Sequence, residues 1–216
     1  MIMQFLFDNL TATVIAMTVL LILASMQMRA TRQQVAQTSQ DIVQRQAGQL
    51  TTWLEKDLGQ IGKNMSDDET AFEEPVDSGQ KWLTEKFVFE HEEIDSTGTV
   101  DTVRVRYLIE STGSSREIDM GGTTKSVELY QLTREKKVVG ETGWQAKGGS
   151  IPALEYFDVD LLDRNAEPVS DPVSNEDDVR SVRVRFSLVA PYQNEELAVP
   201  VSRTNVVIAR YPLGDS

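Results

Sequence analysis

The ionisable residues of this chain rarely have the spacing that catalysis or metal binding requires. His91 is the single histidine and there is no cysteine, which excludes two-histidine zinc sites and thiolate chemistry. His91 lies in the segment FEHEE, among acids at the end of a predicted strand, and such a histidine is typically a surface residue. We therefore predict no catalytic residue and no cofactor, and we expect that the protein is not an enzyme.

The carboxylates gather in two places. Asp158, Asp160 and Asp163 alternate in the segment DVDLLDR, which resembles part of a calcium loop but lacks the glycine and distal glutamate of an EF-hand. Residues 66–80 are acidic, carry no Lys or Arg, and contain Pro75, as is typical of a solvated loop. We expect no metal at either place, with calcium as the alternative.

Four arginines alternate along two predicted strands, a pattern that can also bind nucleic acid. The formal charge of −13 opposes that function, because affinity for a polyanion comes from Lys and Arg that neutralise phosphates. We expect solvated strand faces with nearby acids as partners, and no direct binding to nucleic acid. The four residues are Arg104, Arg106, Arg183 and Arg185.

Asp8 is the carboxylate with the strongest functional claim. If a membrane's hydrocarbon begins at Leu10, Asp8 is an ordinary interfacial residue; if it begins near Ile2, the charge is immersed at a cost of roughly 2.5 to 3.5 kcal/mol. That cost favours a charged partner. The N-terminal ammonium of the same or a neighbouring subunit is the nearest candidate, since no Lys or Arg precedes Arg29. Both interpretations stay open.

The segment around Asp8 predicts a long helix whose first part spans a membrane. Residues 10–28 contain no charged residue and would extend roughly 28 Å, close to the hydrocarbon thickness. No glycine precedes Gly48 and no proline precedes Pro75, so we expect one rod over residues 5–61. The alternatives are a break at Gly48, a buried core helix, or a signal-peptide segment in place of the span.

From Val35 onward, apolar residues recur every three or four positions, which indicates an amphipathic helix with one dry side. We predict that this side packs on a folded head, with Trp53 as an aromatic anchor. The predicted helix-to-sheet packing residues are Leu50, Trp53, Leu54, Leu58 and Ile61.

Beyond Lys81 the hydrophobic period falls to two, which predicts strands of an antiparallel sheet. We expect turns at residues 111–115 and at the glycine pairs 121–122 and 148–149, and a long surface loop at residues 164–178. The predicted fold class is α+β, a long N-terminal helix packed on an antiparallel sheet. The six strand candidates are residues 86–90, 103–109, 127–133, 153–158, 182–188 and 204–211. The predicted parts are a transmembrane half-helix (1–28), an amphipathic half-helix (29–64), an acidic linker (65–80) and a β-rich head (81–216).

This order of elements resembles a type IV pilin-like protein. The head is similar to minor pseudopilins of the J type from type II secretion and to PilW-like minor pilins. The similar segments are VRYLIE (105–110), VELYQLTRE (127–135), IPALEYFDVDLLDRNAEP (151–168), DVRSVRVRFSLV (178–189) and TNVVIAR (204–210). The basic, glycine-terminated leader of such proteins has no counterpart in MIMQFLFD.

The resemblance implies a non-enzymatic subunit that assembles into, initiates or caps a type IV pilus-like filament or a type II secretion pseudopilus. It implies that Asp8 is the counterpart of the family's glutamate if Gln4 opens the mature protein. The implied assembly interface comprises Asp8, Phe5, Phe7, Leu10, Val14, Met17 and Leu21.

The implied partners are other pilin-like or pseudopilin subunits through the N-terminal helix, and inner-membrane lipid before assembly. Secreted cargo and the assembly platform are further candidates. The implied location is the bacterial inner membrane, single-pass, with the head periplasmic or in an extracellular filament, although Arg29, Arg32 and Arg45 after the span favour a cytoplasmic head. The alternatives are a membrane-anchored binding or adaptor protein that forms no filament and a secreted hydrolase released by signal cleavage.

Overall fold

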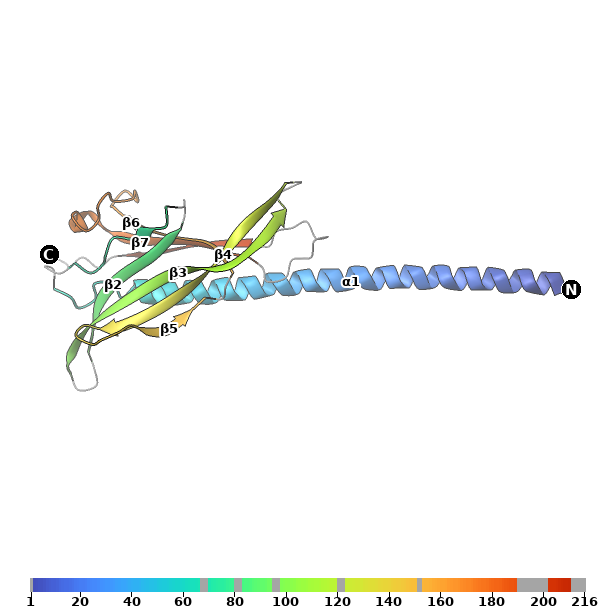
Figure 1. The fold of residues 1–216 in the computed structure, drawn as a ribbon, viewed down its shortest axis with the longest axis horizontal. Coiled ribbons are helices and arrows are strands. Elements are labelled where there is room, and N and C mark those ends of the chain that lie inside the picture. Colours follow the sequence, from blue (N-terminus) through green and yellow to red (C-terminus); the bar gives the residue numbers. More distant parts are fainter. Residues whose placement is uncertain are drawn as a thin grey trace.

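The computed structural model describes residues 2–66, 70–79, 83–94, 98–119, 123–150, 153–189 and 202–210. For residues 2–9, 118–119, 124–125, 202–205 and 210 it describes the backbone alone. One long helix, α1 (Ile2–Leu58), runs from the N-terminus into a β-rich head, and more than half of its length projects beyond the head (Figure 1). The predicted α+β class, with one long N-terminal helix on an antiparallel sheet, is confirmed.

Helix α1 is continuous, as the sequence predicts. It contains 57 residues, about 86 Å at 1.5 Å per residue. Gly48 causes no break, and a Cβ atom at that position would meet nothing within 4 Å. The helix ends at Leu58, where Gly62 and Asn64 adopt positive φ angles of 70° and 62° and turn the backbone toward the sheet.

The head is built on an eight-stranded antiparallel sheet. Its strand order is β1-β2-β3-β4-β6-β7-β8, with β5 paired to β4, so neighbours in the sheet are mostly neighbours in the sequence. A short 3-10 helix, η1 (Glu176–Asp178), lies between β6 and β7. The strands are β1 (Val76–Asp77), β2 (Thr84–Ile94), β3 (Val100–Asp119), β4 (Thr124–Val138), β5 (Gln145–Gly149), β6 (Leu154–Leu162), β7 (Ser181–Val189) and β8 (Ser202–Arg210).

The structure corrects two predicted turns. Residues 111–115 lie inside β3, which continues through a bulge between Ser111 and Ser114 that places Gly113 at a φ of 66°. Gly149 lies in β5, where a Cβ atom would come within 2.4 Å of the Leu132 carbonyl oxygen, so glycine permits this close strand approach. The pair 121–122 lies outside the described residues, and β1 and β5 were not among the predicted strands.

The core lies between one face of the sheet and the C-terminal part of α1. Alternate residues of the two clearest predicted strands point into it, as period-two patterning requires. Tyr107 is at its centre, with its ring centroid 5.8 Å from that of Trp53, 5.7 Å from that of Phe89 and 6.4 Å from that of Phe157. These edge-on aromatic contacts join the helix to three strand positions.

The predicted acidic linker is only partly solvated. Ala71 and Phe72 are buried, because this segment runs along β2, where Phe72 forms an isolated bridge to Phe89. Glu73 forms ion pairs with Lys86 and Arg104. The linker therefore covers one edge of the sheet as well as connecting helix and head.

Candidate functional site

The exposed part of α1, which we call the stem and define as residues 10–38, is the most unusual surface of the molecule. All of its residues are exposed except Ser25 and Ala36, which are half-buried. Burial against the head begins at Ser39, later than the first residue of the predicted dry side, since Val35 is 39% exposed. The stem projects from the head over its whole length (Figure 1).

The predicted assembly residues whose side groups are described lie in the stem and are fully accessible. Leu10 is 65% exposed, Val14 56%, Met17 62% and Leu21 71%. Residues 10–28 carry no charge, so apolar side chains face outward in every direction around the helix. Such a surface is unfavourable in water and stable in hydrocarbon or against other apolar helices.

The few polar groups of the stem bond within the helix. Thr18 Oγ1 donates to the Val14 carbonyl at 2.8 Å, Ser25 Oγ to Ile22 at 2.7 Å, and Thr31 Oγ1 to Gln27 at 3.0 Å. Hydroxyl groups bonded in this way need no water, which lowers the cost of placing them in lipid. The stem is therefore suited to an apolar environment in its hydrogen bonds as well as in its composition.

One described helix is long and apolar enough to be a membrane span or a signal sequence. Within Leu10–Leu58, its most apolar window has a mean hydropathy of 2.0, and none of that window is buried in the protein. A core helix of a soluble protein would have its apolar window buried. The predicted span and its alternative as a signal segment both remain consistent with this helix.

Three predicted assembly residues precede the stem. The backbone of Phe5, Phe7 and Asp8 is helical and continuous with the stem, but their side chains lie outside the described residues. The charge pair of Asp8 with an N-terminal ammonium therefore stays a prediction.

At its other end, α1 packs against the head through the predicted docking residues. Leu54, Leu58 and Ile61 are completely buried and Leu50 nearly so, while Trp53 is half-buried with its ring edge-on to Tyr107. Val43 and Ala47 extend the same buried stripe toward the stem. The helix is thus held by an apolar strip of about five turns.

A buried polar network at this junction was not predicted. Asp57 accepts a hydrogen bond from Tyr107 Oη at 2.9 Å and a bidentate pair from Arg134, whose Nη2 lies 3.1 Å from Oδ1. Burial, together with the neighbouring Asp57 carboxylate, raises the pKa of Tyr107 well above its ordinary value. The sequence does hold a signal, since Asp57 falls on the apolar stripe between Leu54 and Ile61.

His91 is buried, contrary to the surface position expected from its acidic neighbours. Its exposed fraction is 4%, because β2 pairs in the sheet with β3 and His91 lies opposite Val103. Its Nε2 is 3.0 Å from Glu93 Oε1. Hydrogen bonds from Lys136 and then from His91 lower the pKa of Glu93.

The four alternating arginines pair with acids across the strands. Arg183 contacts Asp160 at 2.8 Å, and Arg185 contacts both Asp158 and Asp160. Burial, followed by the nearby Asp160 charge, raises the pKa of Asp158. Arg104 similarly pairs with Glu73 and Glu90, and Arg106 with Glu135. The described residues contain no group of three potential metal-ligating side chains.

Comparisons with known protein families, curated proteins and solved structures found no match to this protein. The architecture itself is pilin-like: a long N-terminal apolar helix packs by its C-terminal part on an antiparallel β-sheet. Its distinctive surface is the stem, which the head leaves uncovered.

Proposed function

We propose that the protein is a non-enzymatic subunit of a filament of the type IV pilus or type II secretion pseudopilus kind, which it helps to initiate or cap. The observation that carries this proposal is the stem: an uncharged, fully exposed helix, continuous with a helix that is packed into a folded head. The stem would lie in the inner membrane before assembly and among the stems of other subunits afterwards.

The energetics of the stem support such an exchange of environments. Lipid tails and neighbouring apolar helices solvate Leu10, Val14, Met17 and Leu21 about equally well, so transfer between them has little hydrophobic cost. Packing and any charge pair then decide which helices associate and in what register. Asp8, at the start of the stem, would provide that charge pair.

The continuity of α1 matters for the same role. A helix that has no break at Gly48 and is anchored by Leu54 and Asp57 holds the stem in one direction relative to the head. Neighbouring subunits that associate through their stems would then bring their heads into a fixed relation. A flexible tether would not do this.

Site-specific crosslinking tests the proposal directly, because the protein has no cysteine of its own. In the native host, Leu21→Cys should crosslink to cysteines placed in the stems of other pilin-like subunits. Thr52→Cys, on the exposed side of the head-packed part of α1, is the matched control and should not crosslink to those stems. A single-pass anchor that forms no filament would give no stem-to-stem crosslink at either position, and that result would contradict the proposal.

Asp8→Ala tests the charge pair separately. The variant should keep a folded head, with an unchanged near-ultraviolet circular dichroism spectrum, and should lose incorporation into filaments recovered from the host. Asp41→Ala, an exposed acid of the same helix, should incorporate normally. Normal incorporation of Asp8→Ala would refute the role of Asp8 while leaving the crosslinking result to decide on assembly.

A further inference from the structure

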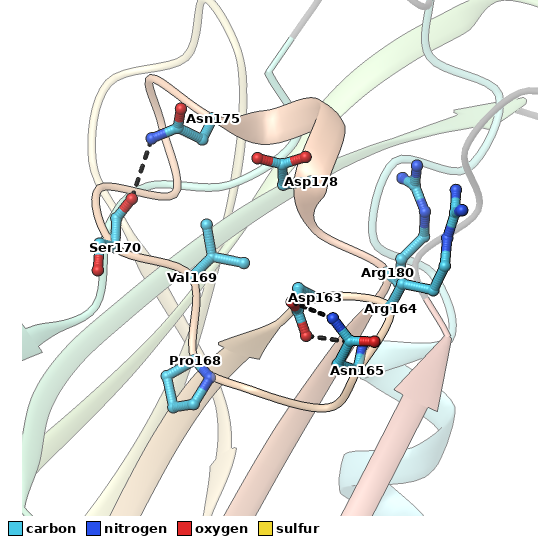
Figure 2. A pocket seen from close by; sticks show the side chains of 9 residues that line it. All are labelled: Asp163, Arg164, Asn165, Pro168, Val169, Ser170, Asn175, Asp178 and Arg180. Carbon is cyan, nitrogen blue, oxygen red and sulfur yellow. Dashed lines mark hydrogen bonds between the residues drawn. The ribbon is translucent and has the colours of Figure 1, made fainter.

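A polar hollow lies at the end of the head opposite the free end of α1, where the loop between β6 and β7 folds back on itself (Figure 1). Its volume is about 650 Å³, within the range of ordinary ligand-binding sites. We call it the distal hollow, and Figure 2 shows its lining. It is lined by Asp163, Arg164, Asn165, Pro168, Val169, Ser170, Asn175, Asp178 and Arg180.

Two arginines of the distal hollow differ from most arginines of the head. Arg164 and Arg180 form no ion pair with any described residue, and the side-chain hydrogen bond of Arg180 goes to the Val179 carbonyl oxygen at 3.2 Å. Figure 2 shows their side chains running in the same direction. By contrast, five arginines of the sheet and junction each pair with a carboxylate; these are Arg104, Arg106, Arg134, Arg183 and Arg185.

This difference is informative because the protein is rich in acids. With 34 acidic and 21 basic residues, most sites on the head offer a guanidinium group a carboxylate nearby. Two guanidinium groups that line one hollow without such a partner leave their donors available. A planar guanidinium matches the geometry of a carboxylate, which it can bind through two parallel hydrogen bonds.

The loop that carries the hollow is held in place by its own hydrogen bonds. Arg180 N donates to the Leu162 carbonyl at 2.7 Å, which fixes the two ends of the loop beside one another. Asp163 accepts from the backbone N–H groups of Asn165 and Glu167 at 2.8 and 2.9 Å. Asn175 Nδ2 donates to the Ser170 carbonyl at 3.0 Å. The arginines therefore start from a defined scaffold, which reduces the entropy lost on binding.

The acids of the lining restrict the kind of anion that fits. The Asp163 carboxylate is occupied by the loop backbone, whose N–H groups, that of Glu167 foremost, hold its pKa below the ordinary value. Asp178 stays as a second negative charge, and Figure 2 shows it beside Asn175 rather than against the arginine side chains. Together with the protein's net charge of −13, Asp178 disfavours polyanions and favours a ligand with a single negative charge.

We propose that the distal hollow binds a carboxylate of a partner polypeptide through Arg164 and Arg180. The group is either an Asp or Glu side group or the terminal carboxylate of the partner. The place of the hollow, at the far end of the head, leaves it open to a partner when the stem is in lipid or among other stems. The inference concerns a different part of the molecule from the stem, so it stands or falls separately from filament assembly.

Peptide binding to the full-length protein in a nonionic detergent tests this site. One peptide is glycine-rich with a single glutamate and blocked termini, a second is a glycine pentapeptide with a free terminal carboxylate, and a third is the same pentapeptide with both termini blocked. Each carries a neutral fluorophore, and fluorescence anisotropy measures binding. We expect one or both carboxylate peptides to bind and the blocked pentapeptide not to bind; which of the two binds more tightly identifies the source of the carboxylate.

Two matched variants separate the site from general electrostatics. Arg164→Gln with Arg180→Gln should weaken carboxylate binding by at least about tenfold, as expected when charge-assisted hydrogen bonds are lost. Lys56→Gln with Lys147→Gln removes the same charge at two exposed positions elsewhere and should change the affinity by less than about twofold. Circular dichroism of both variants checks that the head remains folded.

Three outcomes would overturn the proposal. The first is equal binding of the blocked and the carboxylate peptides, or no binding of any peptide. The second is equal weakening by the arginine and lysine variants. The third is complete displacement of the peptides by inorganic phosphate at concentrations where chloride has no effect, which would assign the hollow to phosphate instead. The single variants Arg164→Gln and Arg180→Gln provide the same readout if the double variant does not fold.

Discussion

The two halves of α1 share one continuous backbone and differ in what surrounds them. In the stem, residues 10–38, side chains are exposed on every side, whereas in residues 39–58 a stripe that includes Val43, Ala47, Leu50 and Leu54 is buried by the head. Apolar residues all around a helix require an environment that this head does not supply. An apolar stripe on one side requires a single surface, and the sheet supplies it.

The halves also differ in where they place charge. Residues 10–28 have none, while the head-packed half buries Asp57 with Arg134 and Tyr107 as partners. A buried carboxylate is tolerated only with a fixed partner, and Arg134 comes from a strand that lies far away in the sequence. The stem has no such strand beside it, so charge there would have to be met by another molecule.

The largest expected effect comes from the same substitution in each half. Leu54→Asp buries a carboxylate without a partner at a position that is completely buried, and it should destabilise the head by more than about 4 kcal/mol. Leu20→Asp, at a position that is 65% exposed, should change head stability by less than about 0.5 kcal/mol. It should instead impair membrane insertion, at a cost of roughly 2.5 to 3.5 kcal/mol.

Urea unfolding in detergent, followed by near-ultraviolet circular dichroism, measures the first effect, and carbonate extraction of host membranes measures the second. If Leu20→Asp unfolded the head, or if Leu54→Asp left it stable, the two halves would not have the separate environments described above.

A smaller effect is expected for the buried carboxylate of the junction. Asp57→Ala leaves the Arg134 guanidinium and the Tyr107 hydroxyl buried without their acceptor, and should reduce the free energy of unfolding by about 3 to 5 kcal/mol. Asp41→Ala, on the exposed side of the same helix, should cost less than about 0.5 kcal/mol. Chemical denaturation of both variants provides the comparison; equal costs would mean that the junction does not depend on this network.

The smallest effect is expected at Tyr107 and depends on pH. Tyr107→Phe should cost about 1.5 to 3 kcal/mol at neutral pH, since it removes a hydrogen bond to a charged acceptor. The folded-state pKa of Tyr107 is raised by burial, so the unfolded tyrosine ionises first, near pH 10. The wild type should therefore lose stability relative to the variant above pH 10, by at most about 1.4 kcal/mol per pH unit.

Denaturant titrations of the two proteins between pH 8 and 11, in roughly half-unit steps, measure this difference directly. Other tyrosines titrate in both proteins, so their contributions cancel. A constant difference across this range would show that Tyr107 ionises as readily in the folded state as in the unfolded one, against the burial seen in the structure.

The sequence predicts the parts of the fold that depend on local periodicity. The single rod, its passage through Gly48 and the six principal strands all follow from spacing along the sequence. The strands β1 and β5 do not, because they are short or glycine-rich and are stabilised by pairing with β2 and β4. The burial of His91 was missed for a similar reason, since its acidic neighbours describe its surroundings along the sequence and β3 determines its surroundings in space.

At the stem and in the distal hollow the two kinds of information separate most clearly. Hydropathy alone determined that residues 10–28 need an apolar environment, because that need follows from composition whatever the rest of the protein does. Only the tertiary structure decided that the head leaves them uncovered, that Asp57 meets Arg134, and that Arg164 and Arg180 line one hollow without a carboxylate. Each of these depends on residues far apart in the sequence, whose proximity is determined by strand pairing and core packing rather than by local sequence.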